Sequence, residues 1–312
     1  MLLTLAPEKF EKIYEEMALN GVSLASPSEF SLDVCFIADG LHCGDTLSFL
    51  GTKGKNIEFR EGELTVVAGP SGHGKSAFMG QVALDLARQH KKVCILSLEM
   101  APGRTLWRMS RIEYGLKVCG CLPQYKDTAG DVAEGFCKSV EKDILLLNKV
   151  GSATPREVFG VMAKANELGC EHIIIDNLMR VCPEYGDKAN EAQKEFIQDL
   201  IALTKHLNVH TWLVHHVRKG SNETDEINKY SIRGAAAITD NADNVILLQR
   251  NLKKEKSLEE AGDDIERCIS IDREDADSTL IVDKQRNGEW QGRIGLWYSK
   301  EFMRFWPTFE RK

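Results

Sequence analysis

The hydrophobic residues of the chain fall into short runs, and longer stretches with helical spacing separate the early runs. The runs typical of β-strands are residues 64–68, 92–98, 172–175, 209–214, 244–248, 279–283 and 293–298. Most of them are apolar at consecutive rather than alternate positions. This pattern is typical of parallel strands that are buried on both faces of a sheet.

The stretches with helical spacing of apolar residues are 77–89, 154–168 and 191–207. The second begins with Thr154, Pro155 and Glu157, a capping box with proline at the first helical position. Alternating strands and helices predict an α/β fold in which helices cover both faces of a mainly parallel sheet.

The first 30 residues have a different pattern. Residues 7–19 predict a short amphipathic helix with Phe10, Tyr14 and Met17 on its apolar side, and residues 26–28 mark a linker. We therefore divide the chain into a helical arm over residues 1–30 and a main domain over residues 31–312. A lone helix cannot bury its apolar side, so we expect it to pack on its own domain or on a neighbouring subunit.

Composition places the chain among ordinary globular proteins, with 43% hydrophobic and 28% charged residues among 312. Its apolar runs are too short to cross a membrane, and the stretch at residues 1–7 is too short for a signal sequence and lacks a basic start. Nine cysteines without a disulfide-like spacing fit a reducing compartment. These features predict a cytoplasmic protein without a membrane partner.

The net charge of −7 is unevenly distributed. Residues 253–277 contain ten acidic and five basic residues and carry −5 of the total, which leaves −2 for the rest of the chain. A nearly neutral body with a local basic lining can still bind a phosphate backbone. We expect the acidic segment itself to be a solvated loop or hairpin.

A complete phosphate-loop pattern, G-x-x-x-x-G-K-[ST], follows the first strand-like run. It consists of Gly69, Pro70, Ser71, Gly72, His73, Gly74, Lys75 and Ser76, and Ala77 continues into the helix. A glycine-rich surface turn is the alternative, but the strand–loop–helix context favours a site for a nucleoside triphosphate. Lys75 is expected to reach the β- and γ-phosphates, and Ser76 is expected to ligate Mg²⁺.

Three later strand-like runs end in residues suited to nucleotide hydrolysis. Glu99 could activate the attacking water, and Asp176 could bind Mg²⁺ opposite Ser76. His215 and His216 end another run, and only one of them can face the nucleotide because adjacent strand residues point to opposite faces. Each of these residues also has a plain alternative as an ordinary residue at a strand end.

Two cations, Lys284 and Arg286, follow the run at 279–283 and share a face by strand alternation. Such a pair at a strand end suits a phosphate that is reached from outside, as an arginine finger does. By spacing alone, a pair of surface cations is the simpler interpretation.

These motifs, in this order, resemble the RecA-type ring helicases of the DnaB superfamily. The closest likeness is to the branch of phage primase-helicases and mitochondrial Twinkle. The stretches that carry it are GPSGHGKS, SLEM at 97–100, IIIDNL at 173–178, LVHHVRK at 213–219, SIRGAAA at 231–237, ADNVILL at 242–248 and KQR at 284–286. The resemblance covers about residues 45–305 and implies a RecA-like P-loop ATPase core.

The resemblance also implies roles for individual residues. Glu99 would be the catalytic base, His216 the γ-phosphate sensor, and Arg286 the finger acting on the next subunit, with Lys284 beside it. Arg250 and Tyr298 would sandwich the base. The residues implied to line the DNA strand are Arg218, Lys219, Lys229, Arg233 and Gly234.

The implied function is an ATP-dependent replicative helicase that moves 5′→3′ on single-stranded DNA as a hexameric ring. Its cofactors would be ATP, or another NTP or dNTP, with Mg²⁺. Its partners would be a replication fork and a separate primase, loader or polymerase, in a bacterial or phage-infected cytosol. Two alternatives remain open at this point: a filament-forming recombinase or repair ATPase, and a nucleotide-switched loader or accessory protein.

Overall fold

The computed structural model describes residues 26–27, 31, 44–181, 187–217, 226–232 and 235–311. The helix predicted over residues 7–19 lies outside the described residues.

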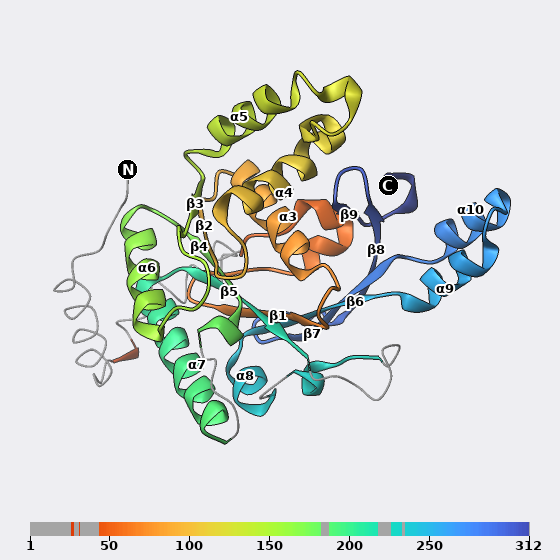
Figure 1. The fold of residues 1–312 in the computed structure, drawn as a ribbon. Helices are drawn as coiled ribbons and strands as arrows, with labels where there is room; N and C mark the ends of the chain where they lie inside the picture. The colour runs from red at the N-terminus through yellow and green to blue at the C-terminus, as the bar shows by residue number, and fades with distance from the viewer. Residues whose placement is uncertain are drawn as a thin grey trace.

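One mixed sheet forms the centre of the described part of the chain (Figure 1). Its nine strands have the order β3-β2-β4-β5-β1-β6-β7-β8-β9. Neighbours from β3 to β6 are parallel, whereas β7 is antiparallel to both β6 and β8, and β9 is antiparallel to β8. The strands are β1 Leu64–Gly69, β2 Val93–Ser97, β3 Ile144–Leu146, β4 His172–Asp176, β5 His210–His216, β6 Asn244–Arg250, β7 Ser278–Gln285, β8 Gly292–Ser299 and β9 Arg304–Trp306.

Helices pack on both faces of this sheet. The α-helices among the described residues are α3 Lys75–Arg88, α4 Pro102–Tyr114, α5 Ala129–Val140, α6 Pro155–Glu167, α7 Asp187–Leu207, α8 Ala235–Asn241, α9 Leu252–Ala261 and α10 Ile265–Glu274. The 3₁₀ helices are η2 Ser48–Asn56, η3 Gly115–Val118, η4 Pro123–Tyr125, η5 Leu178–Arg180, η6 Lys229–Ser231 and η7 Phe309–Arg311.

Side chains at alternating strand positions pack into two separate hydrophobic cores, one on each face of the sheet. Val66 of β1 belongs to a buried cluster with side chains of α6, α7 and α8. Its neighbour Val67 belongs to a second cluster, on the other face, with side chains of α3, α4 and α5. Figure 1 shows these two groups of helices on opposite sides of the sheet. The continuous apolar runs in the sequence therefore reflect burial on both faces.

Each of the seven predicted strands matches a strand of the structure, and the three predicted helices match α3, α6 and α7. The capping box is confirmed: Glu157 N donates to Thr154 Oγ1 over 3.2 Å, and Thr154 N donates to Glu157 Oε2 over 2.8 Å. Strands β3 and β9 were not predicted, because three residues are too few to show a pattern.

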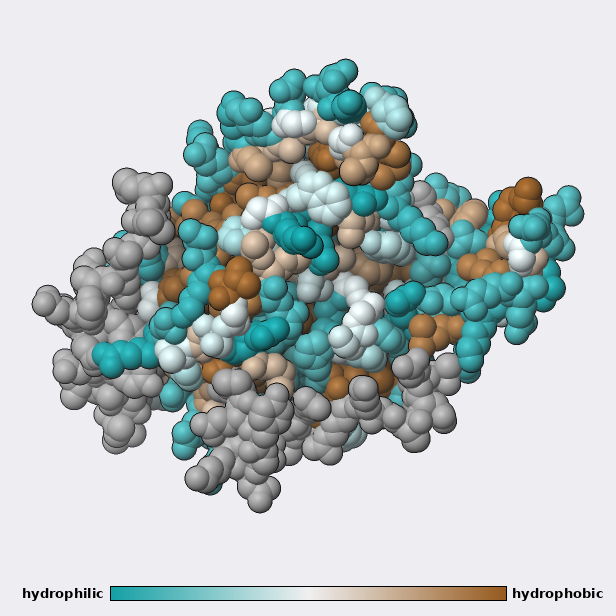
Figure 2. All heavy atoms as spheres, viewed as in Figure 1, coloured by the Kyte–Doolittle hydropathy of each residue, from teal (hydrophilic) through white to brown (hydrophobic). Residues whose placement is uncertain are grey.

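The prediction of a solvated loop or hairpin for the acidic segment 253–277 is wrong in its local structure. Residues 252–274 form helices α9 and α10, and Figure 1 shows this pair projecting from the body of the molecule. The side chains of Asn251 and Asp264 cap the two helices. Figure 2 shows hydrophobic atoms toward the far end of this projection. Ile265 and Ile269 of α10 are exposed.

None of the described helices combines the length and the apolar character that a membrane crossing requires.

Candidate nucleotide site

The phosphate loop connects the end of β1 to the start of α3. Gly72 and Gly74 have φ angles of 80° and 88°, in the left-handed region that favours glycine. A side chain at Gly69 would place its Cβ 2.3 Å from the carbonyl oxygen of Leu248. The N-cap residue of α3 is Gly74, which has no side chain to cap the first turn, so the N–H groups of that turn and the helix dipole suit an anion.

Lys75 lies at the mouth of this loop. Its Nζ donates to the carbonyl oxygens of Gly69 over 2.8 Å and Pro70 over 2.9 Å, and it lies 3.3 Å from Nδ1 of His216. Burial lowers the pKa of Lys75 to about 8, although the carboxylates of Asp176 and Glu99 oppose that shift. The loop therefore holds a buried ammonium group where a phosphate would lie.

Ser76 and Asp176 meet across the site, as the sequence predicts for a Mg²⁺ site. Ser76 Oγ donates to Asp176 Oδ2 over 2.7 Å. Burial raises the pKa of Asp176, and the nearby charge of Glu99 acts in the same direction. A buried carboxylate beside a hydroxyl and a second carboxylate is an all-oxygen donor set, and it fits the preference of Mg²⁺. Arg108 of α4 also lines a small hollow with Ser76.

Asn177 connects the two other predicted catalytic residues. Its Nδ2 donates to Glu99 Oε1 over 2.6 Å and lies 3.2 Å from Nε2 of His216. His215 points to the opposite side of β5 and is fully buried, so His216 is the histidine at the site. Sequence reasoning assigned no role to Asn177. Its position directly after Asp176, at the end of β4, was the available signal.

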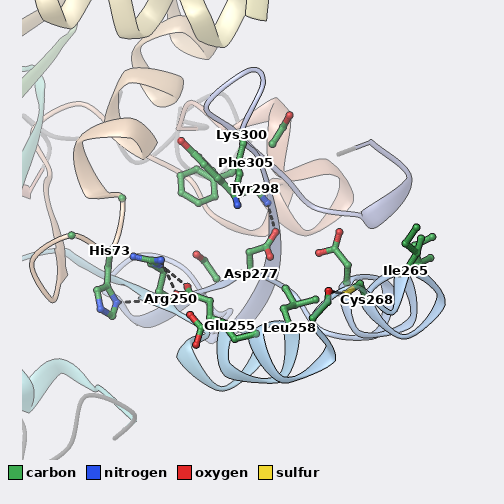
Figure 3. A pocket seen from close by; sticks show the side chains of 18 of the residues that line it. His73, Arg250, Glu255, Leu258, Ile265, Cys268, Asp277, Tyr298, Lys300 and Phe305 are labelled. Carbon is green, nitrogen blue, oxygen red and sulfur yellow. Dashed lines mark hydrogen bonds and ion pairs between the residues drawn. The ribbon is translucent and has the colours of Figure 1, made fainter. Parts of the chain in front are cut away.

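Arg250 and Tyr298 line a groove that starts at the phosphate loop (Figure 3). The groove has a volume of about 1230 Å³, and Gly72, His73 and Gly74 form one end of it. Arg250 N donates to Nδ1 of His73 over 2.9 Å. Because β6 and β8 run in the same direction, Arg250 and Tyr298 both lie at the edge of the sheet that carries the loop.

Lys284 and Arg286 do not join this site within one chain. Strand β7 is antiparallel to β6, and Gln285 pairs with Asn244 at the start of β6. The two cations therefore lie at the opposite edge of the sheet, away from the phosphate loop of their own chain. Lys284 Nζ donates to the carbonyl oxygens of Thr239, Asp240 and Ala242 at the end of α8. Arg286 Nη1 lies 3.1 Å from Asp243 Oδ1.

Of the five residues predicted to contact DNA, only Lys229 is among the described residues. It lies in η6, where its backbone N–H donates to Asp283. Its Nζ lies 5.6 Å from the ring centre of Tyr230, a side chain that is 73% exposed. Arg218, Lys219, Arg233 and Gly234 lie outside the described residues.

Comparisons with known proteins identify a family and a fold for this chain. Residues 58–222, more than half of the chain, match the AAA domain family AAA_25. The structure described as the ATPase domain of G40P superposes with a TM-score of 0.73 at 15% identity, over 91% of this chain and 99% of that one.

A DnaB-like replicative helicase, described together with its interactions with primase, superposes with a TM-score of 0.70 at 14% identity. This match covers 96% of the present chain and 76% of the helicase chain. The chain therefore has the RecA-like fold of DnaB-like ATPase domains, and it belongs to the AAA domain family.

Proposed function

We propose that the protein is an ATP-dependent DNA helicase that works as a ring on single-stranded DNA. The observation that carries this proposal is the separation of two sets of residues. The phosphate loop, Glu99, Asp176 and His216 meet at one edge of the sheet, and Arg286 lies at the opposite edge. The similar folds of a G40P ATPase domain and a DnaB-like replicative helicase support it.

The first set of residues fits hydrolysis of a nucleoside triphosphate, ATP or another NTP or dNTP. Lys75 neutralises the β- and γ-phosphates, and Glu99 accepts the proton of the attacking water. Asn177 orients both Glu99 and His216, so the latter can hydrogen-bond to the γ-phosphate. Mg²⁺ held by Ser76 and Asp176 would neutralise charge that develops on the phosphate oxygens.

The second set acts on a neighbouring copy. An arginine that cannot reach its own phosphate loop suits a head-to-tail interface, in which each copy completes the site of the next. Such interfaces close into rings or extend as filaments, and we propose a closed ring of six. Hydrolysis at these interfaces would then be coupled to relative motion of the subunits.

The DNA would pass along the surface that carries η6. Lys229 supplies a cation, and the exposed ring of Tyr230 supplies a face on which a base can stack. A cation beside an aromatic ring binds single strands with little preference for sequence. We propose 5′→3′ movement at a replication fork in the cytoplasm, with a separate primase, loader or polymerase as partner.

A fork-unwinding assay combined with native mass measurement tests the proposal. With ATP, Mg²⁺ and a forked DNA, the protein is expected to displace the paired strand, and its mass is expected to correspond to six copies. Lys75→Ala should abolish strand displacement.

Three outcomes would reject the helicase. Strand exchange by extended filaments would identify a recombinase. DNA-independent nucleotide binding with negligible turnover would identify a switch. Full ATPase activity of a single copy would exclude the shared site.

A further inference from the structure

A buried ammonium group joins α9 and α10 to the sheet. The side chain of Lys254 is 1% exposed. Its Nζ lies 2.6 Å from Asp272 Oδ1 in α10 and 2.7 Å from Asp277 Oδ1, just before β7. A buried ammonium group is stable only when it is paired. The two ion pairs therefore fix the positions of Lys254 and of both carboxylates. This trio fixes the base of the projecting helix pair.

The same trio connects to Arg250 and Tyr298, two of the residues that line the nucleotide groove beyond the phosphate loop. Asp277 Oδ2 accepts a 2.7 Å hydrogen bond from the backbone N–H of Tyr298. Glu255, which follows Lys254 in α9, forms a two-point contact with Arg250 at 2.7 and 2.8 Å (Figure 3). A planar contact of this kind fixes the orientation of a guanidinium group.

We infer that Lys254 is a positioning residue, which sets Arg250 and Tyr298 for the nucleoside end of a bound triphosphate. The inference rests on the proposed function, because it takes the phosphates to lie on the loop. Gly72 and Gly74 form one end of the groove, and Arg250 and Tyr298 line it beyond them. A triphosphate bound to the loop therefore directs its nucleoside toward these two residues.

The two ends of the groove differ in charge. The loop end offers the backbone of Gly72, His73 and Gly74, whereas α9, α10 and the segment after them supply carboxylates. The carboxylates that line the groove are Glu255, Glu259, Asp263, Asp272 and Asp277, and the cations among its lining residues are Arg250 and Lys300. Carboxylates repel phosphate and accept hydrogen bonds from ribose hydroxyls and base amino groups. The side of the groove that α9 and α10 form thus favours binding of a nucleoside over binding of a phosphate.

The test compares ATP with inorganic tripolyphosphate, which has no nucleoside, as ligands of the full chain. Lys254→Met is expected to raise the dissociation constant of ATP about tenfold and to change that of tripolyphosphate less than about twofold. KM for ATP should rise in the same proportion while kcat stays near the wild-type value. Lys256→Met is the matched control, because Lys256 lies exposed on the same helix, and both constants should stay unchanged.

Glu255→Gln provides a second variant, which removes an exposed ion pair and leaves the buried trio intact. It should weaken ATP binding several-fold and leave tripolyphosphate binding unchanged. The inference is overturned if Glu255→Gln binds ATP like the wild type, or if Lys254→Met weakens both ligands equally. A wild-type protein that prefers ATP to tripolyphosphate but fails to unwind DNA would refute the proposed helicase and leave this inference standing.

Discussion

Ser76 Oγ donates a 2.7 Å hydrogen bond to Asp176 Oδ2, and this contact joins the start of α3 to the end of β4. The two residues are 100 positions apart in the sequence. Their contact defines where a divalent cation would meet the triphosphate.

Replacing Asp176 with Asn is therefore expected to lower the rate of ATP hydrolysis by at least about a hundredfold. The amide keeps the shape but lacks the negative charge that a cation requires. Hydrolysis and nucleotide binding are measured over a Mg²⁺ titration, and binding without Mg²⁺ should stay near the wild-type value. Ser76→Ala should act in the same direction, and the double variant should be little worse than Asp176→Asn. An unchanged Mg²⁺ requirement in Asp176→Asn contradicts this assignment.

Asn177→Ala is expected to lower kcat on the order of a hundredfold, because Glu99 and His216 lose the side chain that orients them. KM for ATP should change less than about twofold, since the phosphate loop is untouched. Steady-state hydrolysis measures both constants. Asn166→Ala is the control, because Asn166 lies in α6 and hydrogen-bonds to the Leu207 carbonyl at the end of α7. Equal losses in both variants would mean that the effect is one of folding.

Mixing two inactive variants tests the site shared between copies. Lys75→Ala and Arg286→Ala remove groups from opposite edges of the sheet, so a mixture should form interfaces in which both groups are intact. ATPase activity of the mixture is expected to exceed that of either variant. A mixture of Lys75→Ala and Glu99→Ala should show no rescue, because both changes lie on the same edge. The shared site is rejected if the first mixture behaves like the second.

Tyr230→Ala is expected to weaken binding of single-stranded DNA about tenfold, which corresponds to the loss of one stacked base. Tyr230→Phe keeps the ring and should bind DNA like the wild type. Fluorescence anisotropy with a labelled oligonucleotide measures both variants, and their affinity for ATP provides the control. Equal DNA affinity in all three proteins would mean that single-stranded DNA does not bind at Tyr230.

Acid should destabilise the protein through His210. Burial lowers the pKa of His210 to about 3, and the charge of nearby His172 acts in the same direction. The Arg60 carbonyl, which accepts from Nδ1 over 2.7 Å, and Asp45 oppose the shift. The unfolded chain binds a proton near pH 6.5 and the folded chain does not, so stability falls as the pH drops from about 6.5 toward 3. The slope is at most about 1.4 kcal/mol per pH unit.

Chemical denaturation at several pH values checks this expectation. His210→Asn should be less stable at pH 7 but should show a shallower slope between pH 6.5 and 3. The control is His206→Asn, since His206 is exposed on α7. Parallel slopes for the wild type and His210→Asn would rule out this histidine as the cause.

Much of the fold could be predicted because strands such as β2 and β6 contain four consecutive apolar residues. The phosphate loop was equally clear, since its glycines and Lys75 have fixed spacing. Asn177 was not assigned a role, because only the meeting of β2, β4 and β5 reveals that one amide contacts both Glu99 and His216. Local sequence does not record such contacts between strands.

The direction of β7 could not be predicted from the pattern either. An apolar run has the same appearance in either direction, so the sequence did not show at which edge of the sheet Lys284 and Arg286 lie. The fold of residues 252–274 was missed for another reason. Their acidic composition suggested solvation, whereas Lys254 turns part of that charge inward by pairing with Asp272 and Asp277.

The reversed direction of β7 has a consequence for regulation under the proposed function. A single copy carries both the phosphate loop and Arg286 but cannot bring them together. ATP hydrolysis therefore requires contact between copies. The amount of protein in the cell then acts as a threshold. Below this concentration ATP is not hydrolysed. Above it, each copy that joins the assembly activates the nucleotide site of the adjacent copy.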